Sequence, residues 1–127
     1  MMLNYVTVGS DDIDRAARFY DAALGALGYV RLYTDAREIG YGAPGGACRF
    51  WVNRPYDALP ASIGNGSMPC FDAPSRAAVE AFHADGLRAG GRDEGAPGLR
   101  PYGRVFYAAY LRDPDGNKLS AVCEAEG

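Results

Sequence analysis

The chain contains an internal repeat with a spacing of about 63 residues. Four residue types recur at this spacing. The first-half residues are Phe19, Leu24, Ala26 and Gly28, and their second-half equivalents, in the same order, are Phe82, Leu87, Ala89 and Gly91. In each half they lie on an apolar segment of helical character that follows a short strand-like run. Solenoids and propellers repeat every ~20 to 50 residues, so two longer copies in 127 residues predict one pseudo-twofold pair of modules. Equivalent positions in the two halves are the first place to look for a binding site.

The composition is typical of a single folded domain. Of the 127 residues, 48% are hydrophobic, and the net charge is −3. The arginines are scattered among acids and turns and form no basic stripe, which argues against a nucleic acid partner. The segment that begins at Met1 has no charged start and no long apolar run, and no stretch reaches the roughly 18 apolar residues of a membrane span. We therefore expect a cytoplasmic protein that does not contact a membrane.

Three widely spaced cysteines, Cys48, Cys70 and Cys123, indicate neither a disulfide framework nor a zinc site. Their number is odd, and no Cys-x-x-Cys pair is present. An activated thiol needs a base or a positive environment, and no histidine is suitably placed. We expect these cysteines to be buried apolar side chains.

The first half predicts one helix among four strands. Strands are expected over residues 3–9, 29–34, 38–41 and 47–53. The helix begins near Ile13, after candidate N-caps at residues 10–12, and ends at Gly28. Its apolar residues recur with helical spacing and would cover the Val6 and Val8 side of the first strand.

The second half repeats this order after a linker at residues 54–66 that is rich in proline and glycine. Strands are expected over 67–71, 92–94, 105–111 and 117–123, with a loop over 95–103. A helix begins near Pro74 and ends at Gly90 and Gly91. The sequence thus predicts an α+β fold in which one domain, residues 1–127, consists of two βαβββ modules, 1–53 and 67–127.

Several local motifs resemble the vicinal oxygen chelate superfamily of glyoxalase I, bleomycin-resistance proteins, fosfomycin-resistance proteins and extradiol dioxygenases. These motifs include Asp113-Pro114-Asp115-Gly116-Asn117 before the last strand, Arg18-Phe19-Tyr20-Asp21, Leu27-Gly28-Tyr29, and the helix that follows Ala73-Pro74. The resemblance covers nearly the whole chain and implies a cupped mixed sheet around a central cleft. It does not imply one reaction, because this fold supports isomerases, dioxygenases, transferases and binding proteins.

In metal-using members, the resemblance implies one divalent ion held from the first, fifth and eighth strands, with a further ligand from the fourth. These positions correspond to Tyr5, Met68, Ser120 and Phe50, and the spacing from Tyr5 to Met68 matches the repeat. Their side chains are poor ligands for a hard divalent ion. The only histidine, His83, is expected on the surface or edge of the second helix. We therefore expect no metal and no cofactor.

Strand alternation predicts which side chains line the cleft. In the last strand, Leu119, Ala121 and Cys123 form an apolar face suited to packing under a helix, which leaves Ser120 on the other face. The fourth strand is ambiguous, because Arg49 would share the helix side with Trp51. The predicted lining is Tyr5, Thr7, Cys48, Phe50, Met68, Cys70, Tyr107 and Ser120, with Arg104 and Lys118 as positive charges at its mouth. This lining suits a flat or apolar ligand, although the same side chains could fill the cleft as core.

Three classes of function remain open. One is a metal-free protein that binds a small molecule in a cleft shared by two chains, as in the bleomycin-resistance branch, which implies a homodimer. Another is a glyoxalase- or dioxygenase-type enzyme, metal-dependent or with Tyr5 as an acid–base group, although a phenol with a pKa near 10 is a poor base at neutral pH. Ser120 has no visible base to make it a nucleophile. The third is a degenerate homologue with a structural or interaction role.

Overall fold

Two four-stranded sheets and two helices make up the part of the chain that the computed structural model describes, residues 2–125. The first half contains β1 (Val6–Gly9), α1 (Ile13–Gly25), β2 (Val30–Thr34), β3 (Glu38–Gly42) and β4 (Phe50–Asn53). The second half contains β5 (Cys70–Asp72), α2 (Arg76–Arg88), β6 (Arg92–Leu99), β7 (Tyr107–Arg112) and β8 (Lys118–Cys123). The predicted βαβββ order therefore occurs twice.

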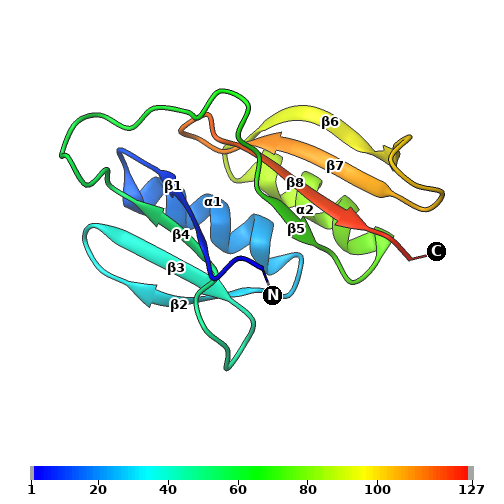
Figure 1. Ribbon diagram of the computed structural model, residues 1–127, viewed down its shortest axis with the longest axis horizontal. Coiled ribbons are helices and arrows are strands. Elements are labelled where there is room, and N and C mark those ends of the chain that lie inside the picture. Colours follow the sequence, from blue (N-terminus) through cyan, green and yellow to red (C-terminus); the bar gives the residue numbers. More distant parts are fainter. Residues whose placement is uncertain (1, 126–127) are drawn as a thin grey trace.

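The two sheets have equivalent topologies. Their strand orders are β1-β4-β3-β2 and β5-β8-β7-β6, and in each sheet the first strand of the module pairs in parallel with the last one. The other pairs are antiparallel, so both sheets are mixed. Figure 1 shows the sheets side by side with both helices behind them. The predicted fold class is confirmed, and the two sheets do not close into one barrel.

Capping groups and glycines set the ends of the helices. The Asp12 carboxylate accepts a hydrogen bond from the Arg15 amide at 3.0 Å, and the Ser75 hydroxyl accepts one from the Ala78 amide at 3.1 Å. Beyond α1, Gly28 adopts a φ of +92°, which a residue with a side chain rarely tolerates. After α2 the left-handed residue is Gly90, with a φ of +105°. In the 63-residue repeat Gly28 corresponds to Gly91, so the left-handed residue comes one position earlier after α2 than after α1.

The helices pack against each other and close one core between the modules. Gly91 is needed there for space, because a Cβ at this position would lie 2.6 Å from Phe19 Cε1. Gly86 is equally confined, since its Cβ would lie 2.5 Å from Leu111 Cδ1. Phe19 and Gly91, which belong to repeated positions of different halves, therefore mark a direct contact between the modules. Neither helix, within residues 2–125, is long and apolar enough to cross a membrane.

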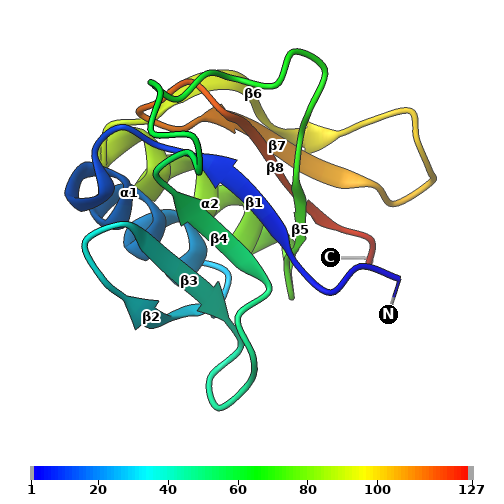
Figure 2. The ribbon, with the colours of Figure 1, turned by 60° about the vertical axis from the view of Figure 1, so that its left-hand side comes forward.

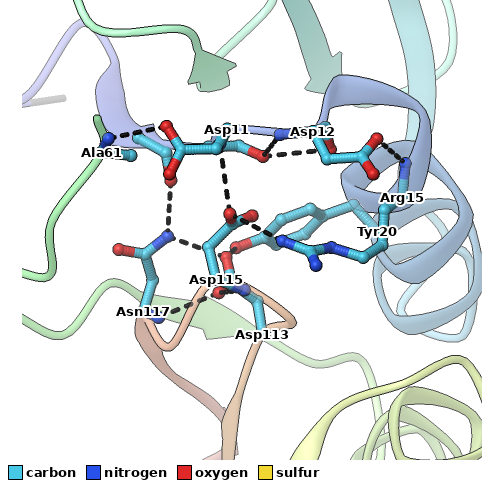
Figure 3. Close-up of polar contacts among 10 residues, drawn as sticks. Asp11, Asp12, Arg15, Tyr20, Ala61, Asp113, Asp115 and Asn117 are labelled. Atoms are coloured by element: carbon cyan, nitrogen blue, oxygen red, sulfur yellow. Dashed lines mark hydrogen bonds and ion pairs between the residues drawn. The ribbon is translucent and has the colours of Figure 1, made fainter. Parts of the chain in front are cut away.

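A buried polar junction also joins the modules at the turn between β7 and β8, residues 113–117, shown in Figure 3. The Asn117 side-chain amide donates to the Gly9 carbonyl at 2.9 Å, and Arg15 forms a 3.0 Å ion pair with Asp115. The connection from β4 to β5, which runs over the top of the molecule in Figure 2, is held to the same region by a 2.7 Å hydrogen bond from the Ala61 amide to Asp11. The predicted turn motif therefore lies at the boundary between the halves.

The main difference from the predicted elements is β6. Residues 95–99 were expected in a loop, but β6 continues to Leu99 and pairs with β7. The register shifts at Gly95 and Gly98, where the strand is irregular. Glycine and proline have low strand propensity, so the strand depends on pairing with β7, which local sequence does not reveal.

Candidate functional site

The candidate site consists of the sheet faces that point away from the helices, which we call the open face. On β1, Val6 and Val8 pack against the core, as alternation predicts, and Thr7 is exposed on the opposite side. Tyr5 directly precedes this strand and is 58% exposed. Both predicted residues of the first strand therefore remain accessible.

Phe50 does not lie on the open face, contrary to the prediction. It is only 4% exposed, and its ring lies 5.1 Å from that of Tyr20 and 5.0 Å from that of Phe71, centroid to centroid. The next residue, Trp51, lies on the open face, in register with Thr7. Counting from the glycine-rich loop gave the wrong parity. This count placed the charged Arg49 on the side that faces the helices, and that unfavourable placement was the sign of the error.

Trp51 is a residue that the sequence analysis missed, and it forms an aromatic surface with Tyr33 of β2. Their ring centroids lie 5.6 Å apart. Gly40 of β3 makes room for the indole, because a Cβ there would lie 2.9 Å from Trp51 Cζ3 and 2.7 Å from Cys48 Sγ. On the first sheet, the Trp51 ring thus lies over Gly40, where there is no side chain, with Tyr33 and Cys48 beside it.

Tyr107 is the second misplaced residue, because it points toward α2. Its hydroxyl donates a 2.7 Å hydrogen bond to Glu80, and the Arg76 guanidinium lies 5.0 Å from the centre of its ring. The bond to Glu80 raises the pKa of the Tyr107 hydroxyl. In the β7–β8 register Tyr107 pairs with Cys123, which belongs to the core-facing set. The sequence analysis already put Cys123 on the helix-facing side of the last strand, so pairing with Cys123 would have put Tyr107 on that side too.

Three residues of the second sheet form a row across the open face. Tyr110 pairs with Ser120, and Ser120 pairs with Cys70. Ser120 is 1% exposed, and its hydroxyl has no hydrogen-bond partner of normal geometry among residues 2–125. Met68, just before β5, is 40% exposed. The parity predicted for Ser120 is therefore correct, but this hydroxyl is covered by its neighbours.

The Cys70 thiol is partly exposed and has an unfavourable environment for ionisation. Partial burial raises the pKa of this thiol against the opposing effect of the neighbouring Ser120 hydroxyl, and the carboxylates of Asp72 and Glu124 raise it further. A raised pKa leaves little thiolate at neutral pH, so Cys70 is a poor nucleophile. All three cysteines are free, and only Cys123 is buried as expected, because Cys48 is half-buried and Cys70 is exposed.

The cations of the second sheet gather around Tyr110. The Lys118 ammonium lies 5.8 Å from the centre of this ring, and the Arg100 guanidinium lies 5.2 Å from it. Sequence reasoning had identified Lys118 but neither Arg100 nor Tyr110. Arg104 is exposed on the connection between β6 and β7, outside both strands.

The donors at the predicted metal positions do not fit a divalent ion. Phe50 is in the core, Ser120 is covered, and Tyr5 and Met68 offer a phenol and a thioether. The His83 imidazole lies on α2, and its Nε2 is 2.8 Å from an Asp93 carboxylate oxygen. Within residues 2–125, no group of three or more His, Cys, Asp or Glu side chains could hold a metal ion.

A surface hollow of about 730 Å³ lies between α1 and the edge strand β2. Its lining includes Asp21, Arg31 and Tyr33 but none of the residues predicted for the site, and Tyr33 therefore adjoins both this hollow and Trp51. A smaller hollow lies under the connection from β4 to β5.

Two βαβββ modules with these equivalent half-sites define a protein of the vicinal oxygen chelate fold. Residues 2–120 match the Glyoxalase/Bleomycin resistance protein/Dioxygenase superfamily, and the chain belongs to that superfamily. No match was found among curated proteins.

Solved structures support the same assignment. A glyoxalase/bleomycin resistance protein from Albidiferax ferrireducens is 39% identical, with a TM-score of 0.87 over 98% of this chain and 100% of the other. A glyoxalase/bleomycin resistance protein/dioxygenase family enzyme from Burkholderia phytofirmans is 21% identical, with a TM-score of 0.73 over 96% and 98% of the two chains. Lactoylglutathione lyase from Agrobacterium tumefaciens is 22% identical, with a TM-score of 0.63 over 97% and 92%. The last two similarities concern the fold alone.

Proposed function

We propose that this protein binds a small, largely apolar or aromatic molecule on its open face without a metal ion. The observation that carries this proposal is the exposure of large apolar side chains there. Tyr5 is 58% exposed, Tyr33 44% and Met68 40%, and Trp51 packs beside Tyr33 without being buried. Exposed aromatic and thioether groups on one sheet face are typical of surfaces that bind ligands or partners.

This exposure favours binding over the degenerate alternative. A cleft that had lost its ligand would be filled by its own side chains, and Tyr5 and Met68 would then be buried. Both side chains instead remain accessible to a ligand. Stacking against an aromatic ring contributes about 0.5–1.5 kcal/mol per pair beyond the area that it buries.

The enzymatic alternative has less support from the open face. A glyoxalase- or dioxygenase-type reaction would need a metal donor set or an acid–base group of suitable pKa. The four positions of the family's metal ligands provide no such donor set, and the Cys70 thiol has a raised pKa. We therefore propose binding in preference to catalysis.

We further propose that the protein is a homodimer. The outer edges of the two sheets differ in a way that supports this. The edge strand β6 is interrupted by glycines and carries Arg92, Asp93 and Glu94, which discourage pairing. The edge strand β2 instead exposes Val30 and Leu32 beside the hollow at α1. A Leu32→Arg substitution is expected to convert the dimer into a monomer, measured by light scattering during size exclusion.

A cytoplasmic location is also part of the proposal. The three cysteines are free in the structure, which suits a reducing compartment. Cell fractionation with an antibody against the protein would test this placement, and recovery in an oxidising compartment would contradict it.

Trp51 provides a direct test of binding, because it is the only tryptophan in the chain. A planar neutral probe such as quinoxaline-2-carboxamide is expected to quench its emission saturably. Tyr5→Ala and Met68→Ala should weaken this response, whereas Tyr56→Ala, which alters a fully exposed ring on the connection from β4 to β5, should not.

Metal analysis of the same preparation completes the test. We expect no stoichiometric divalent ion to accompany the quenching. A stoichiometric ion bound near residues 5, 68 and 120 would overturn the metal-free proposal. The absence of saturable quenching across a panel of planar aromatic compounds would overturn the binding proposal itself.

A further inference from the structure

The open face of the second sheet carries a cationic cluster that the binding of an uncharged ligand would not require. Arg100 and Lys118 both lie against the ring of Tyr110, at 5.2 and 5.8 Å from its centre. Tyr110 is in register with Ser120, so this cluster is continuous with the row that reaches Cys70. The charges therefore lie on the proposed binding surface.

The backbone of β6 holds Arg100 in place. Its Nη2 donates to the Ala96 carbonyl at 2.6 Å, and glycines provide the room for the guanidinium. A Cβ at Gly95 would lie 3.3 Å from Arg100 Nη2 and 2.8 Å from Tyr110 Cδ2, and one at Gly98 would lie 3.0 Å from Arg100 Nη1. The bond to Ala96 orients the guanidinium before any ligand binds, which reduces the entropy cost of using it.

Acids balance this cluster only in part. Arg112 is paired with Glu94 at 2.8 Å, and this bond lowers the pKa of the Glu94 carboxyl. Lys118 makes no ion pair within residues 2–125, but it lies near enough to Glu94 to contribute to the lowered pKa of that carboxyl. Because the whole chain has a net charge of −3, a surplus of positive charge here is a local property of this surface.

The opposite end of the same face is acidic. Asp72 pairs with Val122 near the end of β8, and Glu124 follows that strand. Both carboxylates lie close enough to Cys70 to raise the pKa of its thiol. The face thus changes from positive at Lys118 to negative beyond Cys70, and this arrangement would orient a ligand that carries a charge at one end.

We propose that the ligand is a planar aromatic carboxylate whose anionic group is bound by Lys118 and Arg100 beside Tyr110. Its ring would lie on the apolar surface near Met68 and Cys70, away from Asp72. This inference rests on the proposed binding function and adds the charge of the ligand. Neither cation belongs to the positions that correspond to the family's metal ligands.

Lys118 is the only lysine in the chain, which allows it to be observed alone. Protein grown with ¹³C-labelled lysine gives one set of lysine side-chain signals. Quinoxaline-2-carboxylate is expected to shift these signals saturably and to bind about fivefold more tightly than the uncharged quinoxaline-2-carboxamide. Lys118→Gln and Arg100→Gln should each lower the ratio of the affinity for the carboxylate to that for the carboxamide, which is measured for both probes on each variant.

The matched control is Arg88→Gln, which removes one positive charge from an exposed position on α2. It should leave the preference for the carboxylate unchanged, because a general effect of net charge would be the same for any lost cation. Equal affinity for both probes would overturn the anionic ligand but not the binding function, whereas binding of neither probe would overturn both. Inorganic phosphate that competes as strongly as the carboxylate would overturn the requirement for an aromatic ring.

Discussion

The phenolic hydroxyl of Tyr20, on α1, donates a 2.5 Å hydrogen bond to the carboxylate of Asp113, which begins the turn between β7 and β8 (Figure 3). The two residues belong to different modules, and both are buried. Asp113 also accepts bonds from the Asn117 side-chain and backbone amides at 2.9 Å and from the Asp115 amide at 3.0 Å. Burial raises the pKa of the Asp113 carboxyl, against the opposing effect of these donors. The turn motif thus orders its own loop and fixes one half to the other.

Tyr20→Phe is expected to lower the free energy of unfolding by about 1.5–3 kcal/mol, because a buried carboxylate loses a hydroxyl donor. Urea denaturation followed by circular dichroism measures this change. Tyr56→Phe alters an exposed tyrosine and should have no measurable effect. A loss below about 0.5 kcal/mol in Tyr20→Phe would mean that water or another group replaces the hydroxyl.

Phe50→Ala and Trp51→Ala test the orientation of β4 directly. Phe50 is buried among aromatic rings, so its truncation should cost about 3–5 kcal/mol of unfolding free energy. Trp51 lies on the open face, and its truncation should cost much less while reducing the affinity for planar probes, measured by equilibrium dialysis. The reverse ranking of stabilities would show that the fourth strand has the parity first derived from the glycine-rich loop.

Cys70 should react slowly with iodoacetamide at neutral pH. Its thiol has a raised pKa, so the midpoint of its alkylation rate should lie above the value of about 8.5 for an unperturbed cysteine. Peptide mass spectrometry after timed alkylation between pH 7 and 10 gives the profile for this residue alone, and a cysteine in a short peptide is the reference. A midpoint at or below that of the peptide would indicate an activated thiol and revive the enzymatic alternative.

Asp35 should make stability depend on pH in the acidic range. Its carboxylate accepts bonds from the amides of Arg37 and Glu38 at 2.8 and 2.9 Å and from the Tyr33 hydroxyl at 2.8 Å, and these bonds lower the pKa of the carboxyl. A lowered folded-state pKa stabilises the protein above the ordinary pKa of aspartate, and this contribution is lost as the pH falls through the folded value.

The unfolding free energy of the wild type should therefore fall more between pH 7 and pH 3 than that of Asp35→Asn, which no longer titrates at this position. Chemical denaturation at both pH values measures the difference. An identical decrease in the two proteins would show that the turn between β2 and β3 does not contribute to the pH dependence.

Much of the fold could be predicted because local periodicity and turn chemistry repeat across the two halves. The apolar spacing that starts at Ile13, the capping groups and the Asp113–Asn117 turn each indicate one local structure. Resemblance to a superfamily was confirmed by the match over residues 2–120. By contrast, β6 beyond Glu94 has almost no local strand signal, since its backbone is ordered by pairing with β7.

The candidate site was predicted only in part. Tyr5, Thr7, Met68, Cys70, Lys118 and Ser120 lie on or beside the open face, as alternation predicts. Phe50 and Tyr107 were misplaced, because a shift of one residue moves a side chain to the other face of a sheet. Arg100 was missed, since it follows the part of β6 that the sequence does not reveal and folds back onto Tyr110.

Periodicity, caps and turns act over a few residues, and they suffice to specify two βαβββ modules, whereas the positions of the family's metal ligands came from the resemblance to the superfamily. The exposure of the aromatic side chains, the contact of Phe19 with Gly91 and the gathering of cations at Tyr110 required the folded chain. These features join residues that are distant in sequence, so they depend on how strands pair and how the modules pack. Local preferences do not encode that arrangement, because each half alone leaves its core face uncovered.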